Sequence, residues 1–276
     1  MKKITFLLLG ILLSSVYTLA QYADTIYSPK IKSVKFFAGD DQLSYPVLVL
    51  NSGNILQLHF DIMESQPQDL QYSFVHCSWD WREEDIYESD FIDGYYVNDI
   101  LDYKQSFNTH VSYVTYKIVF PNENVNLTVS GNYIIKVFLR SNPDSVLFQK
   151  RFFVVEDNVP VQTNIHQSTI ASLRPTHQEV DFTIDIGGLQ IETPWNYIKA
   201  SIYQNFRFDM ARFLDQPKFY QGSQMIYDYE YENSFPGGNE FRNFNSSQFR
   251  YQSGKIFKYA FTDSTYFCYL LPDNIN

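Results

Sequence analysis

Cysteine is scarce in this chain. Only Cys77 and Cys268 occur among its 276 residues, and they lie far apart in the sequence. A fold held together by disulfides needs more cysteines at closer spacing. The sequence therefore excludes a disulfide framework, and it leaves open whether these two thiols form one long-range bridge or stay free and buried.

Clusters of basic residues are also missing. The chain has 21 Lys and Arg against 31 Asp and Glu, a net charge of −10. Without Lys2 and Lys3, which belong to the export signal, the balance is 19 − 31 = −12. Nucleic acids and anionic membrane surfaces are bound by clustered Lys and Arg. The charge therefore predicts no nucleic-acid partner and no direct membrane insertion.

The common catalytic motifs are absent. The chain has no Gly-x-Ser-x-Gly, His-Glu-x-x-His or Cys-x-x-Cys sequence, and no glycine-rich phosphate loop. His76 and Cys77 are neighbours, but successive side chains of a strand point to opposite faces, so they cannot act as a pair. We expect a core thiol beside an imidazole on the polar face. The sequence predicts a protein that is not an enzyme, with no catalytic residues and no cofactor.

No metal site is predicted from spacing. The remaining histidines, which show no ligand pattern, are His59, His110, His166 and His177. A site assembled from distant segments of the chain remains open.

An apolar run from Ile4 to Val16 follows Lys2 and Lys3. Thr18-Leu19-Ala20 then places small residues at the positions that a signal peptidase reads. The run is shorter than the roughly 20 residues that span a bilayer. We predict a cleavable signal peptide over residues 1–20 and export of the rest.

Alternation of apolar and polar residues with period two recurs along the exported part, and turn residues separate the runs. Examples are the segments 56–61, 114–120, 133–139 and 179–186. This pattern is typical of antiparallel strands in sandwiches. We predict an all-β fold with two immunoglobulin-like sandwich domains, 29–157 and 158–276, after a linker at 21–28. The second domain is expected to be incomplete at its C-terminus.

The stretch from Ser78 to Lys104 breaks the alternation and mixes carboxylates with aromatic rings. Long loops in compact domains are often functional. We predict an ordered excursion that exposes its carboxylates and whose rings form a partner-binding surface or support it from within; the rings concerned are Trp79, Trp81, Tyr95 and Tyr96. Calcium binding and glycoside hydrolysis lack their signatures here.

The sharpest local motif is Phe235–Arg242, with the sequence FPGGNEFR. Proline fixes one backbone angle and the paired glycines allow positive φ, so these residues favour a tight turn. Structurally we expect a turn that leads into a strand; functionally the motif would be a rigid loop tip that presents Asn239 and Arg242 to a partner.

Several short motifs occur in a specific order: Ser44–Val47, Leu50–Gly53, His76–Cys77 with Trp81, Ser106–Asn108, Phe120–Glu123, Ser130–Tyr133, Thr176–Gln178 with Val180–Phe182, and Phe235–Arg242. As an ordered set they resemble the plug protein of the type IX secretion system, a Bacteroidetes family. The likeness runs from about residue 29 to residue 251.

This resemblance implies a periplasmic subunit, associated with the outer membrane, that makes and breaks no bonds. Its partner would be the translocon barrel of the outer membrane, whose periplasmic opening it would plug. The family is also expected to continue beyond residue 276.

Aromatic side chains beside carboxylates on a β-sandwich suit sugar stacking as well. A secreted carbohydrate-binding or surface-glycan module is therefore the alternative function.

Overall fold

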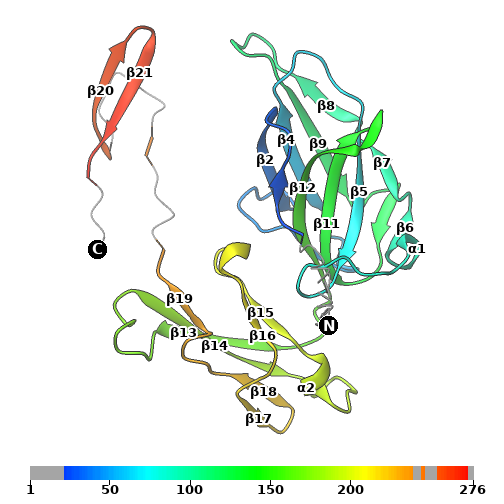
Figure 1. Cartoon of the computed structure of the whole chain (residues 1–276), viewed down its shortest axis with the longest axis vertical. Coiled ribbons are helices and arrows are strands. Elements are labelled where there is room, and N and C mark those ends of the chain that lie inside the picture. Colours follow the sequence, from blue (N-terminus) through cyan, green and yellow to red (C-terminus); the bar gives the residue numbers. More distant parts are fainter. Residues whose placement is uncertain (1–21, 239–243, 246–253, 273–276) are drawn as a thin grey trace, which may run out of the picture. The chain divides into compact units, whose positions relative to one another are not determined.

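The computed structural model describes residues 22–238, 244–245 and 254–272. They divide into two compact units, one up to Asn158 and one from Val159 onward (Figure 1). Nearly all regular structure is β-strand in antiparallel sheets. The predicted all-β, sandwich-type fold is confirmed, and the predicted signal peptide, residues 1–20, lies outside the described residues.

The first unit is a sandwich of two sheets. One sheet contains β1 (Thr25–Ile26), β12 (Asn142–Val155), β11 (Gly131–Leu139), β5 (Leu70–Cys77) and β7 (Val97–Asp99) in spatial order, with β3 (Val47–Val49) parallel to β12. The other contains β2 (Ile31–Ala38), β4 (Leu56–Ile62), β9 (Val114–Phe120) and β8 (Asp102–Gln105). A small ladder joins β6 (Ile92–Gly94) to β10 (Val125–Leu127), after helix α1 (Glu88–Phe91).

Aromatic rings fill the space between these sheets. The apolar residues of β4 and β9 alternate as the sequence predicts, and they face β5, β11 and β12 in one buried cluster. The ring centroids of Phe60 and Phe148 are 4.8 Å apart, as are those of Phe74 and Phe120. Tilted and edge-to-face contacts at this distance stabilise a core beyond the area that they bury. The sandwich is therefore a closely packed base for the segments on its surface.

The segment predicted as a linker, residues 21–28, is bound to this unit in its described part. Strand β1 pairs with β12, Asp24 forms an ion pair with Lys150, and the Gln149 side chain donates a hydrogen bond to the carbonyl of Ala23 at 2.8 Å. The outer edge of β12 offers unpaired backbone groups, and these explain why a short segment without strong alternation becomes a strand.

The second unit is built on one larger sheet. It contains β13 (Val161–Gln167), β14 (His177–Asp185), β18 (Gln224–Tyr227) and β17 (Phe219–Gln221), and β19 (Ser234–Pro236) also pairs with β14. Two-stranded ladders join β15 (Ala200–Ile202) to β16 (Arg212–Leu214) and β20 (Ile256–Thr262) to β21 (Thr265–Leu270). The short helices are α2 (Pro194–Tyr197) and the 3-10 turn Phe208–Met210.

The core of the second unit is small. Its main cluster of buried apolar residues contains Phe182, Ala200, Leu214, Met225 and Tyr227, which bring the β15–β16 ladder against β14 and β18. The rings of Phe182 and Tyr227 stack with centroids 4.6 Å apart. A complete second sandwich over 158–276 stays a prediction.

Within the part of the chain that the structure describes, none of the helices has the length and apolar character of a membrane span.

Candidate functional site

The excursion, Ser78 to Lys104, follows β5 of one sheet and ends within β8 of the other. It is ordered, as predicted, because its short strands pair with three different elements. Strand β6 pairs with β10, β7 extends the first sheet beside β5, and β8 extends the second sheet beside β9. Since β7 is an edge strand of the first sheet and β8 an edge strand of the second, the segment is held to each sheet separately.

Trp81 lies inside the first unit, which corrects its prediction as a contact residue. Its side chain is 0% exposed, its ring centroid is 5.2 Å from that of Phe153, and the Arg151 guanidinium stacks over it at 5.0 Å. Its backbone has φ +66°, a conformation that costs a non-glycine residue about 1–3 kcal/mol. Burial of the indole outweighs that cost, so Trp81 supports the excursion from within.

Asn132 on β11 fixes the same turn. Its side-chain amide donates hydrogen bonds to the carbonyls of Ser78 at 2.9 Å and Trp79 at 3.1 Å. The Ser78 hydroxyl donates to the carboxylate of Asp80 at 2.7 Å, and Arg82 lies 3.1 Å from that carboxylate. The start of the excursion is thus tied to the sheet below it.

Phe91 is the second anchor of the excursion. It is 3% exposed, and its ring centroid lies 5.6 Å from that of His76 and 5.8 Å from that of Tyr133. The one-turn helix α1 places it there, and the Asp90 carboxylate accepts a hydrogen bond from the backbone N–H of Tyr87 at 3.2 Å. Buried Trp81 and Phe91 therefore anchor the excursion to the sandwich at two points along its length.

Several rings of the excursion face solvent. Tyr95 is 67% exposed and Tyr96 is 44% exposed, and Trp79 is exposed as well. The backbone beneath the two tyrosines is fixed, because Tyr95 donates its N–H to the Asn124 carbonyl and accepts from the buried Asn98 side chain, both at 2.8 Å. The structure places three of the four predicted rings at the surface on a rigid backbone.

The carboxylates of the excursion are only partly available. Glu84 lies 2.9 Å from His76, Asp99 lies 3.2 Å from Arg140, and Glu83 accepts a hydrogen bond from Tyr22 at 2.5 Å. Other carboxylates are exposed, namely Asp85, Glu88, Asp93 and Asp102. The predicted acidic surface is therefore smaller than the number of Asp and Glu residues in the excursion indicates.

The motif Phe235–Arg242 is described only over its first residues. Phe235 is buried, and Gly237 donates its N–H to the Thr176 carbonyl at 2.7 Å. Asn239 and Arg242, the predicted contact residues of this motif, lie outside the described residues.

The two cysteines belong to different units of the chain. Cys77 and Cys268 are both free, and burial raises the pKa of the Cys77 thiol to about 12. The prediction for His76 is wrong: it is 7% exposed and packs on the Tyr133 ring at 4.9 Å, rather than lying on a polar face. Alternation separates the two side chains, but the excursion covers the face that the sequence assigns to solvent.

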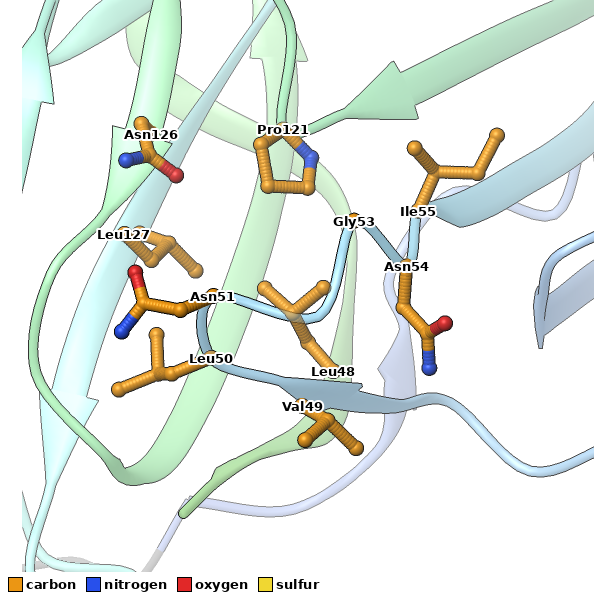
Figure 2. A pocket seen from close by; sticks show the side chains of 10 residues that line it. All are labelled: Leu48, Val49, Leu50, Asn51, Gly53, Asn54, Ile55, Pro121, Asn126 and Leu127. Carbon is orange, nitrogen blue, oxygen red and sulfur yellow. The ribbon is translucent and has the colours of Figure 1, made fainter.

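A pocket of about 310 Å³ lies between the β3–β4 turn, Pro121 and the end of β10 (Figure 2). The described residues that line it are Leu48, Val49, Leu50, Asn51, Gly53, Asn54, Ile55, Pro121, Asn126 and Leu127. These side chains are apolar or carboxamides, and none of them ionises near neutral pH. The pocket therefore offers no general acid or base.

One group of side chains in the described ranges could hold a metal ion: His166, Glu179 and Asp181, in the second unit. The histidine spacing gave no indication of it.

Gly94 ends strand β6 in a position that admits no side chain. Its φ is +113°, and a Cβ there would lie 2.2 Å from the Asn124 carbonyl oxygen. We expect Gly94→Ala to lower the free energy of unfolding by at least about 2 kcal/mol more than Gly53→Ala, through added overlap with the backbone. Gly53 has φ +76° with open space around it, so it shares only the backbone strain. Urea unfolding measures both free energies. Equal losses of stability in the two variants would contradict the close approach of Gly94 to the Asn124 carbonyl.

Residues 31–156 match the family model described as "Type 9 secretion system plug protein 1st domain". The predicted resemblance to the plug family is confirmed for this part of the chain. The match encloses the whole excursion and every strand of the two sheets of the first unit except β1. It supports a plug role related to type 9 secretion.

A solved structure is similar over more of the chain. It is the crystal structure of a hypothetical protein from Parabacteroides merdae ATCC 43184, and it resembles this chain with 27% sequence identity and a TM-score of 0.82. The alignment covers 91% of this chain and 64% of that one, so this chain spans less than two thirds of its relative. No curated protein matches the chain.

Proposed function

We propose that this chain is a non-enzymatic periplasmic subunit of the type IX secretion system that plugs the periplasmic opening of the outer-membrane translocon barrel. The match of residues 31–156 to the plug family carries this proposal. A barrel that passes folded cargo leaks when it is open. A plug protein therefore needs a surface that fits the opening, and it has to dissociate from the opening again.

The geometry of the first unit suits a plug protein. A surface that is already ordered loses little conformational entropy on docking, so modest contacts are enough to hold it. Here the sandwich has a closely packed aromatic core, and the excursion is tied down by Trp81, Phe91 and Asn132. The exposed rings Tyr95, Tyr96 and Trp79 are then the contact residues, since tyrosine and tryptophan dominate binding energy at interfaces.

Capture from membranes tests the proposal. We expect the tagged full chain, expressed in its native host, to co-purify with one very large outer-membrane barrel after detergent extraction. A tagged, exported β-sandwich protein of similar size serves as the control. Recovery of the tagged chain without such a barrel would contradict the proposal.

A further inference from the structure

Three metal-ligating side chains meet on one face of the β13–β14 ladder. His166 and Glu179 are direct cross-strand partners, and Asp181 follows Glu179 by two residues, so all three point to the same face. Their ligand atoms lie within 4.8 Å of one another. Two separate strands thus build the cluster, and the ladder fixes its register.

Glu179 is the unusual member, because its carboxylate is buried. The sequence places it on the polar side of an alternating strand, but its exposed fraction is 0%. One oxygen, Oε2, accepts hydrogen bonds from the backbone N–H and the hydroxyl of Thr169, at 2.7 and 2.8 Å. The other, Oε1, accepts none from any described residue. A buried carboxylate oxygen without a donor is costly, and a cation removes that cost.

His166 is held in the orientation that a metal ligand needs. Its Nδ1 lies 2.8 Å from the carbonyl oxygen of Gln167, which can only accept a hydrogen bond. Nδ1 therefore carries a proton and is the donor of this hydrogen bond. A hydrogen bond of this kind directs Nε2 toward the ion in histidine metal sites. Nε2 lies 2.7 Å from Asp181 Oδ2. Two lone pairs at this distance repel, so a second proton lies between them in this arrangement, and a metal ion would take its place only after the two atoms move apart.

Asp181 has a neighbour that steadies its other oxygen. The Asn233 amide nitrogen lies 3.4 Å from Asp181 Oδ1 and donates a shorter bond to the Tyr227 carbonyl at 2.9 Å. Asn233 is itself buried. The carboxylate is therefore backed by the turn that leads into β19.

We propose that His166 Nε2, Glu179 Oε1 and Asp181 Oδ2 bind one divalent first-row transition-metal ion, with Zn²⁺ the best fit. Zinc accepts imidazole and carboxylate ligands together, usually four in a tetrahedron, so a water completes the set. Calcium and magnesium prefer more ligands, all of them oxygen. Ligands about 2.1 Å from zinc lie roughly 3.4 Å apart, so binding requires side-chain shifts of about an ångström.

The ion would act as a cross-strand clip. It joins β13 to β14 in a unit whose main buried apolar cluster, among the described residues, is the small one given above. Binding to the folded state alone stabilises that state by mass action. This role is independent of plugging, because it concerns the second unit by itself.

Isothermal titration of ZnCl₂ into the full chain, stripped with EDTA and dialysed, tests the site. We expect one ion per chain and at least about 10-fold weaker binding in Glu179→Gln, which keeps the size of the side chain. The matched control is His177→Gln, since His177 is a partly exposed histidine of the same strand outside the cluster. It should bind as the wild type does.

A second measurement covers the case in which Glu179→Gln does not fold. Co²⁺ added to the stripped wild-type chain should produce visible d–d absorption that one equivalent of Zn²⁺ abolishes. Wild-type protein that binds neither ion would overturn the proposal, as would a folded Glu179→Gln variant that binds like the wild type.

Discussion

Replacing Trp81 with alanine should lower the free energy of unfolding by about 3–5 kcal/mol, the usual cost of removing a buried tryptophan. The side chain is 0% exposed and contacts Phe153 and Arg151, so its loss leaves a cavity beneath the excursion. The backbone strain at φ +66° remains with alanine, so nothing offsets the lost packing. Urea unfolding of the full chain measures the change in the free energy of unfolding. Hydrogen exchange of the backbone amides in β11 and β12 is the second measurement.

Trp79 supplies the matched control for this experiment. It is two residues away, and its side chain is 41% exposed. Trp79→Ala should change the free energy of unfolding by about 0.5 kcal/mol or less, as surface substitutions do. Similar losses in the two variants would contradict the division between a supporting ring and a surface ring.

The double substitution Tyr95→Ser and Tyr96→Ser should weaken binding to isolated outer-membrane fractions by at least about 30-fold, the effect of losing one hot spot worth about 2 kcal/mol. Both rings are exposed, and the backbone that carries them is hydrogen-bonded to Asn124 and Asn98. Removing them should therefore leave stability nearly unchanged. Binding is measured as the protein concentration that half-saturates the membranes.

Tyr27→Ser is the control for the double substitution. Tyr27 is 55% exposed in the same unit but lies outside the excursion. It should bind the membranes like the wild type. If the double variant also binds unchanged, the excursion is not the contact surface.

Much of the first unit could be predicted from the sequence. The strands β4 and β9 and the burial of their alternating apolar residues follow from period two alone, whereas β11 also buries Ile134 and Phe138 on its other face. The parallel pairing of β3 with β12, and the capture of residues 25–26 by the edge of β12, could not be predicted. These pairings depend on which edge is free in the folded protein, and no local pattern encodes that.

The errors at individual side chains have one physical cause. Period two separates the two faces of a strand, but it does not say what covers each face. His76 and Glu179 are buried because other segments pack over them, and Trp81 is buried because its turn folds back on the sheet. The sequence did not predict the cluster of His166, Glu179 and Asp181. Glu179 and Asp181 lie beside His166 only because of the register in which β13 and β14 pair.

The permeability of the outer membrane tests the plugging role most directly. Cells of the native host that lack this chain should take up a fluorescent dye that the intact outer membrane excludes, and expression of the wild-type chain should restore exclusion. The Tyr95→Ser, Tyr96→Ser variant should restore it poorly, while Tyr27→Ser should restore it fully. Unchanged dye uptake in cells that lack the chain but retain the translocon barrel would contradict the claim that this protein closes an opening.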